Sequence, residues 1–77
     1  MTLDAAMAWL HARGGKVHVV KRDDVQQFYQ VVVGAHRSHM VGLPHRGRTD
    51  VPTDDPVFLR AFVQMVETVR QKVDHKM

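Results

Sequence analysis

The sequence predicts a small α+β domain in the order α-β-β-β-α, with a three-stranded antiparallel sheet and two helices packed on one face of that sheet. Apolar residues recur at helical spacing before Gly15, alternate with polar residues in the middle of the chain, and return to helical spacing after Pro52. The chain has 77 residues, of which 44% are hydrophobic. We therefore expect one small globular domain spanning residues 1–77.

The first helix is expected over residues 3–13. Thr2 is a suitable N-cap residue, and Asp4 suits the positively polarised first turn. Gly14 and Gly15 follow the helical pattern. Glycine ends helices because it adopts the left-handed conformation without steric strain.

The middle of the chain is expected to form three strands, at residues 16–22, 28–33 and 39–43. The first segment is rich in valine and the second in valine and aromatic residues, and Asp23 and Asp24 mark the turn between them. Short turns make consecutive strands antiparallel. Because side chains alternate along a strand, at most one of the neighbours Phe28 and Tyr29 faces the core.

A long loop and a second helix complete the predicted fold. Residues 44–52 contain Pro44, Gly47 and Pro52, which exclude a regular element. The helix is expected over residues 55–74, since aspartate and proline at its start are typical of a first turn. Its apolar positions are spaced by three and four residues and form one seam, at Leu59, Phe62, Val66, Val69 and Val73.

Phe58 and Met65 lie beside this seam and widen the apolar face of the second helix. That face offers more apolar surface than three strands are expected to cover. We therefore expect Phe58 and Met65 to be exposed, and the helix to form a homodimer or bind a partner through them.

Basic charge is concentrated in the middle of the chain. No Asp or Glu occurs between Asp24 and Asp50. Residues 36–50 carry three Arg against one Asp, whereas residues 51–77 balance four basic with four acidic residues. A local basic surface is typical of proteins that bind an anionic partner.

The candidate binding surface is therefore residues 36–48, which Lys16, Lys21 and Arg22 of the first strand extend if that strand lies alongside. Arg46 and Arg48 flank Gly47 in a loop. Both arginines lie in the acid-free segment, so no carboxylate within that segment competes with a partner for them. Such guanidinium groups can bind phosphates or an acidic protein surface. The alternative, a solvated basic loop without a partner, stays equally open. The candidate binding residues are Arg37, Arg46, Arg48, His36, His39, His45, Lys21 and Arg22.

No catalytic residue, metal or cofactor is expected. The chain has no cysteine, which excludes disulfides and thiolate metal sites. His36 and His39, with His45 nearby, have a spacing found in metal sites, but a strand directs residues three apart to opposite faces. Ser38 has no nucleophile-elbow sequence around it and is predicted to be a turn residue.

Two short motifs precede the last helix: Gly-Ala-His-Arg at residues 34–37 and Leu-Pro-His-Arg-Gly-Arg at residues 43–48. Together with the element order, they are similar to HicA-type RNA-cleaving toxins. Those toxins have a double-stranded-RNA-binding-like α-β-β-β-α fold and use one histidine in a Gly-Ser-His element. The resemblance implies an RNase role for His36. Ala35 stands where those toxins have serine, so the chain is not assigned to the family.

The function expected from the sequence is that of a non-enzymatic binding or regulatory module. It would be an inhibitor-like protein of the kind that phages and mobile elements encode, acting on a nucleic acid or on a protein complex that handles nucleic acid. One alternative is a small RNase with His36 or His39 as general acid and base. A second is an oligomerising assembly protein.

The expected location is the cytoplasm, because the absence of cysteine fits a reducing compartment. No membrane partner is expected, since no apolar run approaches the ~18 residues that a membrane span needs.

Overall fold

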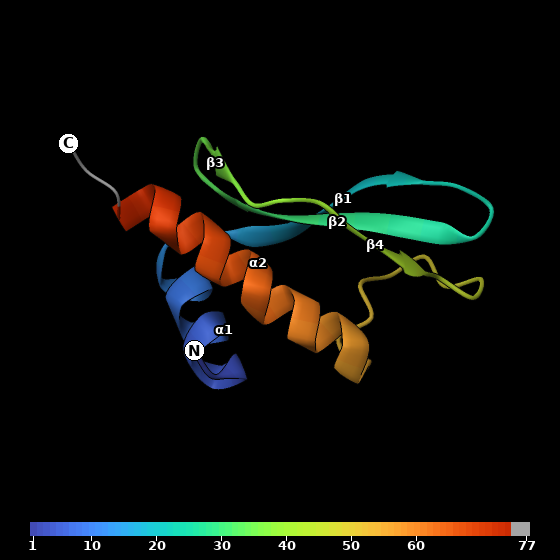
Figure 1. Cartoon of the computed structure of the whole chain (residues 1–77), viewed down its shortest axis with the longest axis horizontal. Helices are drawn as coiled ribbons and strands as arrows, with labels where there is room; N and C mark the ends of the chain where they lie inside the picture. The colour runs from blue at the N-terminus through green and yellow to red at the C-terminus, as the bar shows by residue number, and fades with distance from the viewer. Residues whose placement is uncertain (75–77) are drawn as a thin grey trace.

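Two helices and four short antiparallel strands make up the computed structural model of the chain, which describes residues 1–74 (Figure 1). The elements in chain order are α1 (Leu3–Ala12), β1 (Lys16–Arg22), β2 (Gln26–Val33), β3 (His36–Arg37), β4 (Val41–Pro44) and α2 (Pro56–Asp74). The predicted α+β class, with both helices on one face of the sheet, is confirmed.

β2 is the central strand of the sheet. β1 pairs with one of its edges, while β3 and β4 both pair with the other edge. β3 lies opposite Val32 and Val33, and β4 lies opposite residues 26–29. The sheet is therefore three strands wide, and its third position is filled by two short strands.

The expected third strand at residues 39–43 is thus wrong in its bounds. Ser38 is buried at the break between β3 and β4 and satisfies the backbone there. Its hydroxyl accepts a hydrogen bond from the Val31 N–H (3.0 Å) and donates one to the His39 carbonyl (2.8 Å). The Ser38 side chain thereby replaces part of the backbone hydrogen bonding between the strands. The chain leaves the sheet after Arg37 and returns to it at Val41.

The helices begin where their capping residues predict. The Thr2 hydroxyl accepts a hydrogen bond from the Ala5 N–H (3.1 Å), and Gly14 follows α1 in the left-handed region, with a φ of 65°. A Cβ at Gly15 would lie 2.8 Å from Val33 Cγ2, so only glycine lets α1 turn this closely onto β2. Within residues 1–74, neither helix has the length and hydropathy that crossing a membrane requires.

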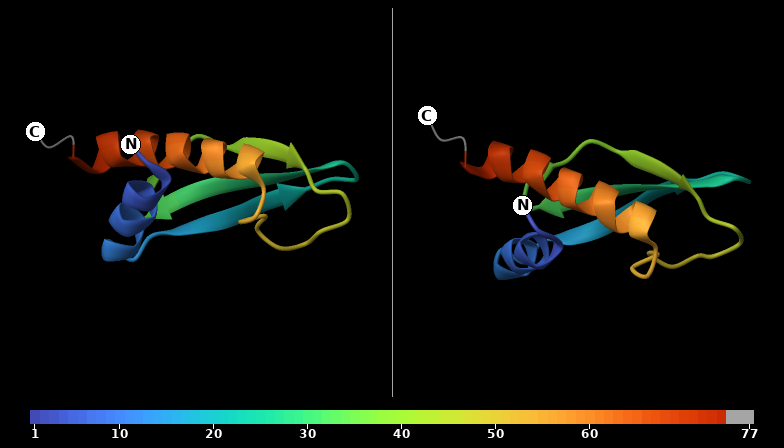
Figure 2. Two further views of the ribbon diagram at one scale, coloured as in Figure 1. Left: turned by 90° about the horizontal axis from the view of Figure 1, so that it is seen from below. Right: turned by 60° about the horizontal axis from the view of Figure 1, so that its bottom comes forward.

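α2 lies across one face of the sheet (Figure 2). The core lies between the odd-numbered side chains of β2 and the apolar face of α2. Tyr29 meets Phe58 edge to face, with ring centroids 5.1 Å apart, and Phe58 stacks on Phe62 at 6.2 Å. α1 packs beside α2 and adds Ala6 and Leu10 to the same core. Burial of these side chains supplies most of the favourable free energy of folding.

Phe58 and Met65 are 1% and 0% exposed, so the expectation that they form an exposed face is wrong. Tyr29 covers Phe58 from the sheet, while α1 packs against α2 and extends the cover beyond the strands. The wide apolar face of α2 is therefore buried against β2 and α1 of the same chain. It gives no reason to expect a dimer through these two residues.

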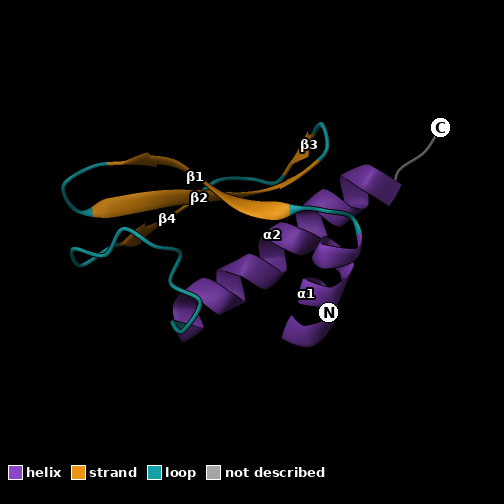
Figure 3. Ribbon diagram, turned by 180° about the vertical axis from the view of Figure 1, so that it is seen from behind, coloured by secondary structure: helices purple, strands orange, loops and turns teal. Residues whose placement is uncertain are grey.

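The opposite face of the sheet carries neither helix, as the view from behind shows (Figure 3). Along β2 the burial alternates, with Gln27 and Tyr29 buried on the helix side and Phe28 and Gln30 half-buried on the other side. We call this second side the uncovered face. Residues directly paired with the even-numbered residues of β2 share it.

A β-bulge in β1 decides which side chains reach the uncovered face. The register runs regularly to the pair Val19–Tyr29 and then skips Val20, so that Lys21 pairs with Phe28. An unbroken strand would place Lys21 opposite Gln27, on the helix side. The bulge therefore moves Lys21 to the uncovered face and Arg22 to the helix side.

Truncation of the central aromatic residue tests this core. We expect Phe58→Ala to destabilise the protein by about 3–5 kcal/mol, because it leaves a cavity between Tyr29 and Phe62. The loss is comparable with the total stability of so small a domain. Val57→Ala is the matched control, because Val57 is 61% exposed and should change the free energy of unfolding by less than about 0.5 kcal/mol. Chemical denaturation measures both variants, and equal losses would show that the core is placed wrongly.

Candidate functional site

Arg22 fastens the loop that connects β4 to α2. Its Nη1 donates to Gln27 Oε1 (2.7 Å) and also to the Arg48 carbonyl oxygen. Gln27 is buried and its amide nitrogen lies 3.3 Å from the Asp50 carbonyl oxygen. The two side chains therefore tie residues 45–55, here called the connecting loop, to the end of the β1–β2 hairpin.

His45 makes a second tie between the same segments. Its Nδ1 accepts from the Gly47 N–H (2.9 Å) and lies 3.2 Å from Arg22 Nη2, while its Nε2 lies 2.9 Å from the Asp23 carbonyl oxygen. Because Gly47 N–H and the guanidinium can only donate, Nδ1 is the acceptor and Nε2 carries the proton. The imidazole thus bridges the loop and the hairpin turn.

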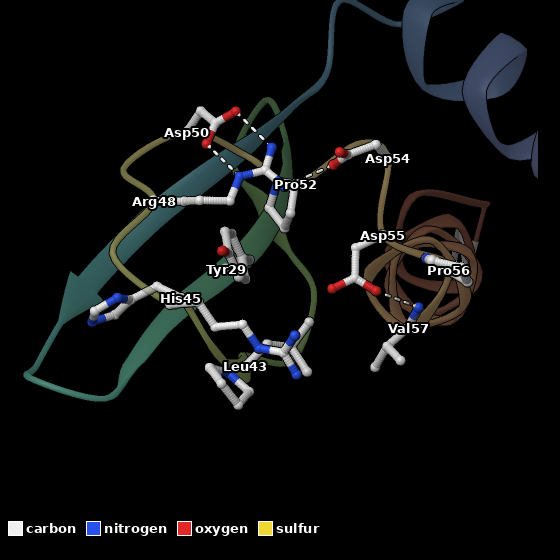
Figure 4. A pocket seen from close by; sticks show the side chains of 12 residues that line it. Tyr29, Leu43, His45, Arg48, Asp50, Pro52, Asp54, Asp55, Pro56 and Val57 are labelled. Atoms are coloured by element: carbon white, nitrogen blue, oxygen red, sulfur yellow. Dashed lines mark hydrogen bonds and ion pairs between the residues drawn. The ribbon is translucent and has the colours of Figure 1, made fainter.

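Arg48 is held between two carboxylates (Figure 4). Its Nε and Nη2 donate to Asp50 (3.0 and 2.9 Å), and its Nη1 donates to Asp54 (2.8 Å). These bonds lower the pKa of Asp50 and of Asp54 and raise that of Arg48. The sequence expectation that Arg48 lacks a competing carboxylate is wrong, because Asp50 and Asp54 fold back from just beyond the acid-free segment.

A cleft of about 460 Å³ lies between the connecting loop, β4 and the start of α2. Arg46 lines it with a left-handed φ of 52°, next to Gly47 with a φ of 83°. Asp50, Asp54 and Asp55 also line it, so its charge is mixed. The mixed charge makes this cleft a weaker anion site than its arginines suggest.

The remaining candidate residues lie elsewhere on the sheet. β3 places His36 opposite Val33, whereas β4 places Pro44 opposite Gln26. Seven residues of β2 separate these rows, or about 23 Å at the usual rise of a strand. His39 is exposed between the two ends. Residues 36–48 therefore do not form one continuous patch.

Arg37 lies instead on the uncovered face, across β2 from residues of β1. It pairs with Val32, which pairs on its other side with Lys16. A shallow depression of about 260 Å³ occupies this end of the face. Its lining is Gly14, Lys16, His18, Val32, Gly34 and Arg37. Among residues 1–74, the side chains that line this depression include Lys, His and Arg but neither Asp nor Glu.

Lys16, His18, Lys21 and Arg37 together form what we call the basic row of the uncovered face. All four are exposed, and none makes a side-chain ion pair within residues 1–74. Of these four residues, His18 was not a candidate from the sequence. The polar and apolar alternation of residues 16–19 could have placed His18 on the same face as Lys16, but the bulge that adds Lys21 to this face left no sequence signal.

The histidines do not converge. Within residues 1–74, no three His, Asp or Glu side chains lie close enough to hold one metal ion. His45 is committed to the connecting loop, and His36 lies far from it along β2. Ser38 lies at the break between β3 and β4 and not in the turn predicted for it, and its buried hydroxyl is hydrogen-bonded to the backbone of Val31 and His39.

Comparison with known proteins finds no relative: no family model matches the chain, and neither a curated protein nor a solved structure is similar to it.

The carboxylates of this region provide a test of the loop geometry. The Gln26 and Val25 N–H groups (2.6 and 2.8 Å) lower the pKa of Asp23, and Arg48 lowers that of Asp50 and Asp54. All three should titrate below 3.8 in carboxyl NMR spectra. Because the folded pKa is depressed, their contribution to stability is complete above the unfolded value and is lost as the pH falls through the folded one.

Arg48→Gln distinguishes the two causes of the lowered pKa values, which are the Arg48 guanidinium group and the backbone N–H groups. It should raise the pKa of Asp50 and Asp54 towards 3.8 and leave Asp23 unchanged, since backbone groups hold Asp23. Titration of Asp50 and Asp54 at 3.8 in the unmodified protein would contradict the ion pairs described here.

Proposed function

We propose that the protein is a non-enzymatic binding module that holds a nucleic acid, free or within a nucleic-acid-handling complex, on the uncovered face of its sheet. The observation that carries the proposal is the basic row: Lys16, His18, Lys21 and Arg37 are exposed on one face. The strands that carry these residues contain no Asp or Glu.

The geometry of the basic row favours a polymeric anion. Lys16 and Lys21 pair with Val32 and Phe28, which are four residues apart on β2, so the two lysines are separated by about 13 Å along the sheet. Arg37 widens the row at one end, across β2. Cations distributed over such a length match a partner whose negative charge repeats, and phosphate contacts supply much of the affinity of nucleic-acid-binding proteins.

The connecting loop has a supporting role in this proposal. Arg22, His45 and Arg48 hold the loop through contacts within the chain, so they are poor candidates for direct phosphate contacts. Arg46 makes no side-chain hydrogen bond within residues 1–74 and stays a candidate contact outside the basic row, at the cleft between the connecting loop, β4 and the start of α2.

The environment of the histidines favours a binding role over the RNase alternative. His36 and His39 are exposed, and neither side chain is oriented by a hydrogen bond within the described residues. General acid–base catalysis by histidine needs such positioning. We further propose a cytoplasmic, inhibitor-like role of the kind encoded by phages or mobile elements, supported by the small size of the chain and its lack of cysteine.

Charge reversal within the basic row tests the proposal. Lys16→Glu and Arg37→Glu should each weaken binding of a labelled oligonucleotide, and each should reduce the slope of log K against log salt concentration by about 0.7–0.9, because each removes a phosphate contact. Fluorescence anisotropy at several salt concentrations measures both quantities.

Arg60→Glu is the matched control. Arg60 is exposed on α2, on the helix side of the sheet, and its reversal changes the net charge by the same amount. It should leave the salt slope nearly unchanged. Equal effects of the three substitutions would show that only the net charge matters, and the uncovered face would then lose its assigned role.

A further inference from the structure

We propose that the uncovered face is specific for single-stranded nucleic acid, with an unpaired base stacked on Phe28 and a backbone phosphate held between Lys16 and Arg37. This inference deepens the proposed function and rests on it. It adds the strandedness of the ligand and the side chain that reads it.

Phe28 is the aromatic side chain of β2 that the helices leave uncovered. Its neighbours Gln27 and Tyr29 are buried on the helix side, whereas Phe28 is half-buried on the opposite side. Of the two neighbouring aromatic residues, Tyr29 therefore belongs to the core and Phe28 to the surface. An aromatic ring on a sheet surface beside cations is the arrangement on which bases stack in single-strand-binding proteins.

Gly42 fixes the position of the Phe28 ring. The two residues pair across β2 and β4, and a Cβ at position 42 would lie 2.7 Å from Phe28 Cδ2. The ring therefore rests on bare backbone, in space that any side chain would fill. Support by β4 orders the ring in advance, so binding a base does not have to immobilise it.

Lys21 already occupies a position over this ring. Its Nζ lies 4.8 Å from the centroid of Phe28, a contact that the β-bulge creates by pairing the two residues. An exposed cation–π contact is weak, and Lys21 has a flexible side chain. A base can therefore displace the ammonium group from the ring, after which Lys21 is free to pair with the phosphate of the same nucleotide.

The depression at the other end of the face supplies the phosphate site. Lys16 and Arg37 flank Val32 from the two neighbouring strands, which places their Cα atoms about 10 Å apart. His18 also lines the depression. Val32 lies four residues from Phe28, about 13 Å along β2, so a strand that follows β2 meets the ring and the depression in turn.

The ring is useful only to an unpaired base. In a duplex the bases are stacked within the helix and present their edges, so a half-buried ring on a broad sheet cannot reach a base face. A duplex would contact the cations alone. We therefore expect single strands to bind more tightly than a duplex of the same sequence.

The test compares Phe28→Leu with Phe28→Tyr, which retains the ring, after circular dichroism has confirmed that both variants fold. The ligands are an oligonucleotide of about 12 nucleotides, within the site sizes of ~4–16 nucleotides known for single-strand-binding folds, its duplex, and the same strand with abasic sites. Phe28→Leu should weaken single-strand binding about five- to a hundredfold, as expected for one lost stacking contact. Phe28→Tyr should bind like the unmodified protein, and duplex binding should not change in either variant.

The abasic strand provides a test that needs no substitution. It should bind the unmodified protein as weakly as the intact strand binds Phe28→Leu, and this comparison decides the question if Phe28→Leu does not fold. Equal affinity for intact, abasic and duplex ligands, with the effect of Lys16→Glu retained, would overturn the stacking inference and leave the proposed function standing. Absence of binding to all three ligands would overturn both.

Discussion

The odd-numbered side chains of β2, which include Tyr29, Val31 and Val33, point into the apolar face of α2. This one-sided burial directs the even-numbered side chains of β2 to the uncovered face. Side chains alternate with a period of two along a strand, so a register shift of one residue would bury Phe28 and expose Tyr29. The contact of Tyr29 with Phe58 opposes such a shift. The identity of the residues on the uncovered face is therefore a consequence of the core.

The bulge at Val20 places two neighbouring cationic side chains, Lys21 and Arg22, on opposite sides of the sheet. Arg22 reaches the helix side, where it holds the connecting loop through Gln27 and His45. Lys21 reaches the uncovered face, where it lies over Phe28. One inserted residue thus gives the sheet both a fastened loop and a cation on the uncovered face, and bulges are known to redirect side chains in this way.

Opposite charges close in sequence limit what the connecting loop can contribute. Arg48 carries a full guanidinium charge, but Asp50 and Asp54 neutralise it at hydrogen-bonding distance. These are exposed ion pairs, which stabilise a structure little and weaken with salt. Their main consequence is that Arg48 is less available to a partner, because a guanidinium group held by two carboxylates is less accessible to a phosphate.

Local patterns in the sequence were sufficient to predict the two helices, the hairpin and the long loop. Thr2, Gly14 and the Asp-Pro start of the second helix act through their immediate neighbours, so a sequence can reveal them. The break at Ser38 depends on a hydrogen bond to Val31 across the sheet, and the bulge depends on pairing with β2. Neither has a local signature.

The candidate site was predicted only in part, for the same reason. Arg37 and Lys21 belong to the basic row and were candidates from charge alone. Residues 36–48 looked like one surface because they are consecutive, but the split between β3 and β4 sends their two ends to opposite ends of β2. Phe28 could not be distinguished from Tyr29, since alternation shows that the neighbours differ in orientation but does not show which one faces the core.

The most direct test of this account is to map the binding surface by NMR. Unlabelled single-stranded oligonucleotide is titrated into ¹⁵N-labelled protein, and the amide shifts are followed. We predict that the largest changes fall on Lys16, His18, Lys21, Phe28, Val32 and Arg37, with α2 nearly unaffected. Changes concentrated in the connecting loop or on the outer surface of α2, with β1 and β2 unchanged, would contradict the assignment of binding to the uncovered face.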